Sequence, residues 1–294
     1  MPLEGLMRRS TLLRKMLEGP EIVVLPGAYD ALSARLAQRA GFDAVFTTGF
    51  GFAAATLGAP DIGLMTASEI IERARNIVNA VDLPVVADMD TGYGNPLNVI
   101  RTVRECVNAG VAGIILEDQE WPKKCGHFEG KRVIAAEDQV QKLRAAVEAR
   151  GDDDLVIIGR TDAREPLGLE EAIRRGKLYR DAGADVVFVE APRSVDELKA
   201  IAAAIPDAPL FANMIEGGKT PLLSSAELQG LGFKMVVYPL SALFAAARAI
   251  FDIYRVLFET KTTASRQGSL MGFHEFEDVV GAPGWREIET RFKA

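Results

Sequence analysis

Carboxylates lie at the ends of two short apolar stretches of the sequence. Residues 84–95 read PVVADMDTGYGN, and residues 113–119 read GIILEDQ. Asp88 and Asp90 end the first stretch, and Glu117 ends the second. Converging carboxylates are hard oxygen ligands that suit Mg²⁺ or Mn²⁺, whereas the two histidines of the chain exclude a histidine-rich transition-metal site. We therefore expect a divalent-cation site here, although either stretch alone could also be an acidic turn in solvent.

The second stretch opens into a polar loop that contains the motif KKCGH. Its thiol, Cys125, has Lys123, Lys124 and His127 as cationic neighbours in the sequence. Nearby positive charge lowers the pKa of a thiol, so we expect the pKa of Cys125 to lie below its usual value. The thiol could act as a nucleophile or as a proton donor, and no paired general base is evident. Gly126 beside it suits a loop that closes over a substrate.

A guanidinium ends another apolar run. Arg160 follows the residues LVIIG. A planar cation at such a position could hold a carboxylate through two hydrogen bonds or stabilise an enolate oxygen. It could also be the buried partner of Glu190 or Glu117, and the two roles are compatible.

The elements that must position these groups follow a regular order. Apolar runs rich in β-branched residues alternate eight times with segments of helical period, and the predicted strands are 22–26, 44–48, 84–88, 113–117, 155–160, 186–190, 210–213 and 235–239. The runs lack polar alternation, as parallel strands covered on both faces do. Eight units of even length favour an α/β fold, a closed (β/α)8 TIM barrel, with an open doubly wound sheet as the alternative. Catalytic groups of such barrels lie at the carboxyl ends of the strands.

The chain reads as a single domain over residues 1–294, with no linker or second domain. We expect an N-terminal helix at about 1–19 and a C-terminal helical segment at about 241–294. Capping boxes, in which a hydroxyl and a carboxylate satisfy backbone donors of a first helical turn, are predicted at 66–69, 194–197 and 224–227. Cys106 falls on an apolar helical stripe and is expected in the core.

Composition excludes several classes of protein. A net charge of −7 without a basic stripe argues against nucleic acid and anionic membranes. No apolar run reaches the roughly 18 residues that a membrane span needs. Two cysteines in different contexts form no disulfide framework, which fits a reducing compartment. We expect a cytoplasmic protein.

The motifs PGAYDALSA, FTTG, PDIGL, DMDTGYGN, LEDQ, KKCGH, RTDAR, VEAP and ANMIEGGKTPL follow one another over nearly the whole chain. In this order they resemble the isocitrate lyase/phosphoenolpyruvate mutase superfamily, and KKCGH marks its lyase branch. The resemblance implies a (β/α)8 barrel and a homotetramer whose subunits swap the eighth helix. Here that helix would be the apolar segment 241–258, whose lack of a polar face fits burial against a partner.

The resemblance also implies a role for each site residue. Mg²⁺ would be held by Asp88 and Asp90 directly and by Asp61 and Glu117 through water. Thr48 and Gly49 would bind the α-keto-acid half of the substrate, Arg160 would stabilise the enolate, and Glu190 and Asn213 would orient the substrate. Cys125, with Lys123, Gly126 and His127 beside it on the mobile loop, would protonate the departing fragment.

The implied reaction is a retro-Claisen cleavage of a 2-hydroxy dicarboxylate that leaves pyruvate or glyoxylate. Phe244 and Phe273 stand where the 2-methylisocitrate lyase pattern has arginines for an extra carboxylate. A third carboxylate would stay unpaired there, at a cost of roughly several kcal/mol, whereas an alkyl group would gain from phenyl rings. The segments ANMIEGGKTPL and MGFHEFEDVVGAPGWREIETRFK are closer to the 2,3-dimethylmalate lyase/2-alkylmalate lyase group, the petal death protein type.

Other functions stay open at this point. The rival activities are oxaloacetate hydrolase or decarboxylase, 2-methylisocitrate lyase and carboxyphosphonoenolpyruvate mutase. Pro239 stands where a serine is expected in oxaloacetate acetylhydrolases. This difference makes the oxaloacetate hydrolase activity a less favoured interpretation. From another class, the chain could be an inactive barrel that serves as a binding or scaffold protein, which the intact Asp88, Asp90, Arg160 and Cys125 oppose.

Overall fold

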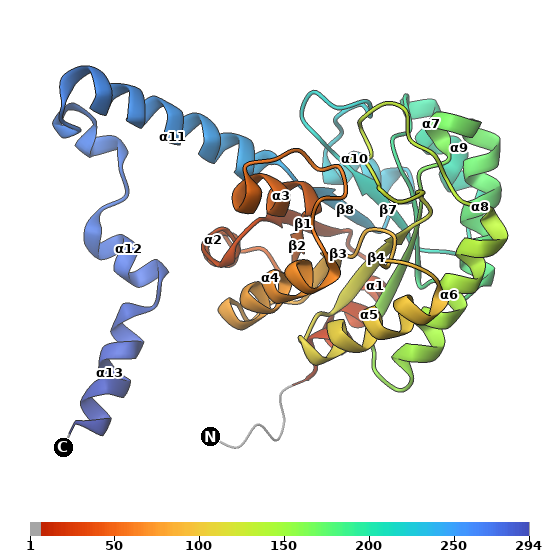
Figure 1. Cartoon of the computed structure of the whole chain (residues 1–294), viewed down its shortest axis with the longest axis horizontal. Helices are drawn as coiled ribbons and strands as arrows, with labels where there is room; N and C mark the ends of the chain where they lie inside the picture. The colour runs from red at the N-terminus through yellow and green to blue at the C-terminus, as the bar shows by residue number, and fades with distance from the viewer. Residues whose placement is uncertain (1–6, 294) are drawn as a thin grey trace.

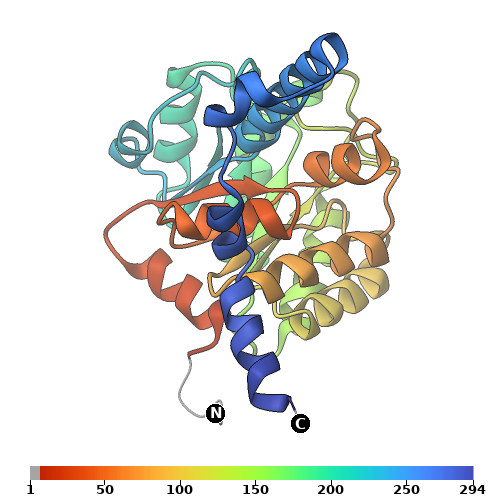
Figure 2. The ribbon, with the colours of Figure 1, turned by 90° about the vertical axis from the view of Figure 1, so that its left-hand side faces the viewer.

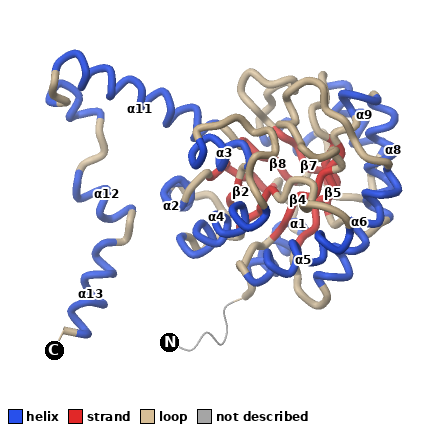
Figure 3. Tube along the Cα trace, viewed as in Figure 1, coloured by secondary structure: helices blue, strands red, loops and turns tan. Residues whose placement is uncertain are grey.

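The computed structural model describes residues 7–293, and they contain a closed barrel of eight parallel strands inside a ring of helices (Figure 1, Figure 3). The strands are β1 (Val23–Ala28), β2 (Val45–Thr47), β3 (Val85–Asp88), β4 (Gly113–Glu117), β5 (Val156–Thr161), β6 (Val186–Val189), β7 (Leu210–Asn213) and β8 (Met235–Tyr238). Each strand pairs in parallel with the next, and β8 pairs with β1 to close the barrel. The predicted TIM barrel is confirmed, and the open sheet is excluded.

Helices follow the strands on the outside of the barrel. Those around the barrel are α1 (Arg9–Glu18), α2 (Ala31–Arg39), α3 (Gly49–Leu57), α4 (Ala67–Ala80), α5 (Pro96–Asn108), α6 (Ala136–Arg150), α7 (Arg164–Leu167), α8 (Leu169–Asp181), α9 (Val195–Ala204) and α10 (Ser225–Gly230). The N-terminal helix is thus shorter than the predicted 1–19, of which residues 1–6 lie outside the described part. The capping boxes form at Thr66 and Ser224. Ser194 also caps its helix, but Glu197 does not complete the box, because its carboxylate binds Arg164 instead.

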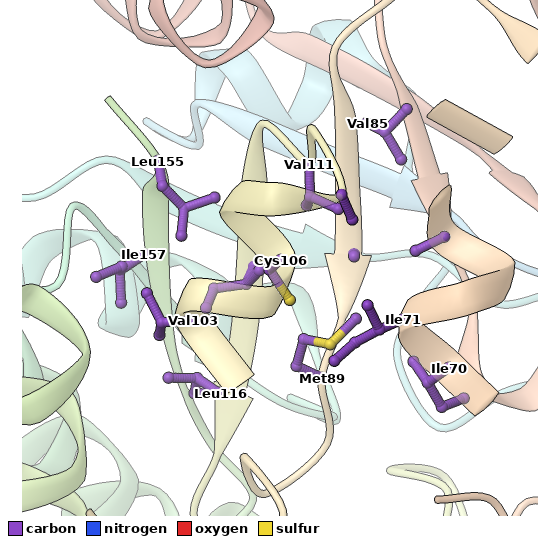
Figure 4. Close-up of a cluster of buried hydrophobic side chains, with 14 of the residues drawn as sticks. Ile70, Ile71, Val85, Met89, Val103, Cys106, Val111, Leu116, Leu155 and Ile157 are labelled. Carbon is purple, nitrogen blue, oxygen red and sulfur yellow. The ribbon is translucent and has the colours of Figure 1, made fainter. Parts of the chain in front are cut away.

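Apolar side chains fill two layers. One layer lies inside the barrel and includes Phe46, Ile158, Phe188 and Phe211, with Leu13 of α1 at the same cluster. The other lies between the strands and the helices, and Figure 4 shows it around Cys106 of α5. Cys106 is fully buried, which confirms its core assignment, and burial raises the pKa of its thiol to about 12.

The C-terminal segment leaves the barrel. α11 (Ser241–Thr260) extends away from it, and η1 (Ala264–Ser269), α12 (Phe273–Val279) and α13 (Ala282–Phe292) follow (Figure 1). Figure 2 views this segment in front of the barrel, where α12 touches α2 and the Arg35 guanidinium donates a hydrogen bond to the Val279 carbonyl (3.2 Å). No residue of α11 is buried in the chain described here. Nevertheless, none of the helices within residues 7–293 combines the length and the apolar composition that crossing a bilayer requires.

Candidate active site

Polar side chains from several strands meet at the carboxyl end of the barrel. The loop formed by residues 122–131, called the lid below, covers them and leaves a cavity of about 40 Å³. Its polar lining comprises Thr48, Asp61, Asp88, Lys123, Lys124, Cys125, Gly126, His127, Arg160, Glu190 and Asn213. The structure therefore brings most of the predicted site residues to one place. A substrate can enter only if the lid moves, because so small a space holds little more than water.

Buried carboxylates form one side of the site. Asp61, Asp88, Asp90 and Glu117 are each less than a tenth exposed. The Lys123 ammonium reaches from the lid to Asp61 Oδ1 (2.6 Å) and Asp90 Oδ1 (2.7 Å). A Cβ atom at Gly49 would lie 3.2 Å from Asp88 Oδ2 and 3.5 Å from Asp90 Oδ1. The Lys123 Nζ lies 3.4 Å from the same point, so the missing side chain at Gly49 leaves room for the two carboxylates and this ammonium.

These carboxylates carry more negative charge than their surroundings neutralise. Burial raises the pKa of Asp90 to about 6, with Lys123 opposing the shift and Asp88 and Asp61 adding to it. Burial also raises the pKa of Glu117 well above its usual range, and Glu117 Oε1 has no hydrogen-bond partner among the described residues. Oxygen ligands of this kind fit Mg²⁺. Within residues 7–293, no three acidic, histidine or cysteine side chains come close enough to form a ready-made cage.

The backbone of the β3–α5 loop, residues 89–95, adopts unusual conformations. Asp90 has a φ of 48° and Tyr93 a φ of 63°, in the left-handed region that non-glycine residues seldom occupy. The Tyr93 hydroxyl donates a hydrogen bond to Asp90 Oδ2 (3.1 Å). Such conformations cost of order 1–3 kcal/mol each and cluster at functional sites. Tyr93 was not predicted as a site residue, although it lies within the DMDTGYGN motif.

Arg160 is held at the centre of the site by carboxylates on three sides. Its guanidinium binds both oxygens of Asp162 (2.8 and 3.0 Å), and it reaches Glu190 (3.2 Å) and Glu117 (3.4 Å). Asp162 lies in the RTDAR motif but was not assigned a role. Arg160 lowers the pKa of Glu190 to about 2 despite burial, so Glu190 is ionised. Asn213 Nδ2 donates to the same carboxylate (3.2 Å).

Cys125 lies in the cavity wall, but its pKa prediction was wrong. Burial raises the pKa of the thiol to about 11 and outweighs the opposing effects of Lys123 and of the His127 backbone N–H. Lys123, two residues before Cys125 in the sequence, is bound by Asp61 and Asp90. The thiol is therefore protonated at neutral pH, which favours a proton donor over a nucleophilic thiolate.

Contacts on both sides hold the lid closed. The Gln119 amide binds the Lys124 backbone at its carbonyl (2.8 Å) and its N–H (3.0 Å). The Lys131 ammonium binds the Gly126 carbonyl (2.5 Å) and Asp162 (2.9 Å). Sequence reasoning missed both clamps, because side-chain reach across a loop leaves no periodic signal.

His127 and Gly126 complete the closure. His127 Nδ1 accepts a hydrogen bond from the Lys219 N–H (2.9 Å), and its Nε2 faces Glu190 Oε1 (3.3 Å). Gly126 packs so tightly that a Cβ atom there would lie 2.6 Å from Arg160 Nη2. The predicted glycine thus permits close contact between the lid and the central ion pair.

Three further predicted residues have distinct surroundings. Thr48 is buried at the cavity, where its hydroxyl caps α3 by accepting from the Gly51 N–H (3.3 Å). Phe244 of α11 packs edge-to-face on Phe50, with ring centroids 6.4 Å apart, and Phe50 lines the cavity. Phe273 does not reach the site of its own chain: it lies on α12, is 79% exposed and contacts the ring of His274. Its predicted place beside the substrate is therefore not found within one subunit.

The fold and this site define a family. Residues 13–258 match the phosphoenolpyruvate phosphomutase family. The chain therefore belongs to the phosphoenolpyruvate mutase/isocitrate lyase superfamily. This confirms the resemblance carried by the sequence motifs.

Individual relatives are similar over nearly their whole length. The chain is 46% identical to 2,3-dimethylmalate lyase of Eubacterium barkeri, covering 97% of this chain and 99% of that one. It is 47% identical to the petal death protein of Dianthus caryophyllus, covering 97% and 90%. A crystal structure of 2,3-dimethylmalate lyase superposes with a TM-score of 0.93 at 37% identity, covering 97% and 96%. A phosphonopyruvate hydrolase solved with oxalate and Mg²⁺ superposes with a TM-score of 0.88 at 30% identity, covering 97% and 99%.

Proposed function

We propose that the protein is a Mg²⁺-dependent carbon–carbon lyase. It cleaves 2-alkyl- or 2,3-dialkylmalates to an α-keto acid, such as pyruvate, and a short carboxylic acid. The observation that carries the proposal is one closed cavity in which buried carboxylates, a fixed guanidinium and a protonated thiol meet. The two lyase-group relatives described above support the substrate class.

Asp88 and Asp90 would hold the Mg²⁺ ion, for which Mn²⁺ could substitute, and Asp61 and Glu117 would contact it through water. When bound, the ion supplies a Lewis acid for the substrate oxygens. Thr48 and Gly49, next to these carboxylates, orient the α-keto-acid half of the substrate. Lys123 bridges Asp61 and Asp90 from the lid, so it couples lid closure to the carboxylate side of the site.

Arg160 and Cys125 act on the other fragment. After the C2 hydroxyl of the substrate has lost its proton to a base, cleavage of the C2–C3 bond gives the keto acid and leaves negative charge on an enediolate, which is costly unless fixed positive charge faces it. Arg160 supplies that charge, because Asp162 fixes its orientation. The Cys125 thiol then donates its proton to the α-carbon of the departing fragment. Glu190 and Asn213 orient the substrate, and His127 holds the lid over Glu190 while water is excluded.

Apolar side chains favour an alkyl group over a third carboxylate. The cavity wall includes Phe46, Phe50, Phe188, Phe211, Ile215, Val237, Pro239 and Leu240. Phe244 does not line the cavity itself but packs against Phe50, which is part of this wall. A carboxylate desolvated against this wall would have to compete for cations already bound to Asp162, Glu190 and Asp90, or draw Lys124 away from the backbone carbonyls of Glu129 and Gly130. The wall therefore supports 2-alkylmalates over 2-methylisocitrate.

We also propose that α11 is swapped between subunits of a homotetramer. Large apolar side chains of α11 are exposed in the single chain, among them Ile250, Phe251, Tyr254, Leu257 and Phe258. Exposed apolar surface of this extent marks an interface. Such an exchange could bring the C-terminal segment, with Phe273, to a neighbouring subunit.

Both cysteines are free, which fits a protein of the cytoplasm, where thiols are kept reduced.

The test compares 2,3-dimethylmalate, 2-methylisocitrate and oxaloacetate as substrates, with Mg²⁺, by following the release of pyruvate and, from oxaloacetate, of oxalate and acetate. We expect cleavage of dimethylmalate, little of methylisocitrate, and a loss of roughly 10²–10⁴-fold in kcat for Cys125→Ser, the range for a positioned proton donor. Cys106→Ala is the matched control, since that thiol lies in the core away from the cavity. Preference for methylisocitrate would contradict the apolar-wall argument. Turnover of oxaloacetate alone, to oxalate and acetate, would replace the lyase by a hydrolase.

A further inference from the structure

A second, larger cavity lies beside the active site, along the β3–α5 loop. Its volume is about 850 Å³, within the range of small-molecule sites. Residues from the start of α4, the β3–α5 loop, the β4–α6 connection and α6 line it. The functions proposed above make no use of this space.

A lysine whose side chain is largely buried lies in the wall of this cavity, and its ammonium has no protein partner among residues 7–293. Lys142 of α6 is only 5% exposed, yet its ammonium makes no hydrogen bond or ion pair with any residue in 7–293. Burial lowers its pKa, and the carboxylates of Glu117, Asp118 and Asp138 oppose that shift from beyond ion-pair distance. Buried lysines are ordinarily paired. An anion in the cavity would supply the missing partner.

The rest of the wall suits a ligand with one charged end. The start of α4, with Thr66 and Ala67 in the wall, is already capped by the Glu69 carboxylate, so Lys142 supplies the positive charge of the wall. The opposite part is apolar and consists of Leu64, Met65, Tyr93, Pro96, Trp121 and Ile134. Trp121 packs against Tyr93 with ring centroids 5.7 Å apart and is half exposed.

From this arrangement we propose that the cavity binds a monocarboxylate with an aromatic or branched alkyl body, whose carboxylate pairs with Lys142 and whose body packs on Trp121 and Tyr93. The site is separate from the catalytic cavity but shares supports with it. Tyr93 binds Asp90, and Gln119, also in the wall, clamps the lid at Lys124. A bound ligand therefore touches residues that hold the β3–α5 loop and the lid.

Tryptophan fluorescence tests the site without reference to lyase activity. The chain has two tryptophans, so Trp285→Phe leaves Trp121 as the sole reporter. The full-length variant is titrated with benzoate, and with neutral benzamide, while oxalate and Mg²⁺ are present in excess to compete for the catalytic cavity. We expect a saturable change with benzoate, at least tenfold weaker binding of benzamide, and no displacement by oxalate.

Substitutions assign the charge. Lys142→Met should weaken benzoate binding at least tenfold, Lys142→Arg should retain it, and Lys177→Met, which removes an exposed lysine of α8, should change nothing. Asp138→Asn should tighten binding, because it removes a carboxylate from the cavity wall. Unchanged benzoate binding by the folded Lys142→Met variant would overturn the proposal. Equal binding of benzoate and benzamide to the protein with Lys142 intact would also overturn it, and that comparison requires no substitution of Lys142. The absence of any saturable signal, or displacement by oxalate, would overturn it as well.

Discussion

Gly126→Ala tests whether the closed lid seen here is the working state. A Cβ atom at this position would lie 2.6 Å from Arg160 Nη2, 2.6 Å from Glu190 Cγ and 2.7 Å from Glu190 Cδ. Neither partner can withdraw freely, because Asp162 holds Arg160 and both His127 and Asn213 hold Glu190. Overpacking of this kind costs about 1–3 kcal/mol.

The location of that cost decides the phenotype. The lid can avoid the clash by staying open, so the penalty falls on closure rather than on folding. A penalty of about 1–3 kcal/mol lowers the closed population by roughly 5- to 150-fold. We therefore expect kcat/KM for dimethylmalate to fall by that factor while the melting temperature stays near that of the wild type.

The assay is pyruvate release beside a thermal melt, with Gly230→Ala of α10 as the matched control. A Cβ atom there would meet nothing within 4 Å. Wild-type kcat/KM for Gly126→Ala would refute the reasoning, since the lid would then not press on Arg160 and Glu190 during turnover. A large drop in melting temperature would show instead that the lid is part of the rigid core.

Three further predictions concern protons, packing and assembly. Burial raises the pKa of Asp90 to about 6 and that of Glu117 well above its usual range. Between about pH 7.5 and 5.5 the folded state therefore binds protons that the unfolded state does not. The Mg²⁺-free protein should consequently become more stable as the pH falls over this range. Saturating Mg²⁺ should abolish this rise in melting temperature, and a stability that falls over the same range would contradict the assignment. Tyr179→Phe removes the hydroxyl that donates to Asp118 Oδ2 (2.6 Å). The free energy of unfolding measured in urea should therefore fall by about 1.5–3 kcal/mol. A fall below about 0.5 kcal/mol would mean that the remaining donors to Asp118 compensate. Phe251→Asp with Phe258→Asp on α11 should lower the mass measured by sedimentation, whereas Lys199→Asp on α9 should not; an unchanged mass for the double variant would place the subunit interface elsewhere.

Local patterns in the sequence predicted the barrel and many of the side chains that gather at its carboxyl end. Eight apolar runs separated by helical segments permit few arrangements, and parallel strands place their carboxyl ends on one rim. Asp88, Arg160 and Asn213 could therefore be assigned to one site from their positions at strand ends. The pairing of a hydroxyl with a carboxylate three residues later located the starts of α4 and α10 for the same reason: the interaction spans a single helical turn.

Tertiary structure alone decided in which direction individual side chains point and how burial changes their pKa values. Glu117 and Asp118 are adjacent in the sequence, but Glu117 faces Arg160 in the site while Asp118 binds Arg175 and Tyr179 of α8, because successive strand residues point to opposite faces. The three cations near Cys125 suggested a lowered pKa, yet burial outweighs them, and Lys123 is drawn to two distant acids. Phe273 likewise could not be placed from the sequence, since α11 carries the C-terminal segment away from the barrel. Desolvation and long-range contacts depend on which surfaces meet in three dimensions, and a linear pattern does not contain that information.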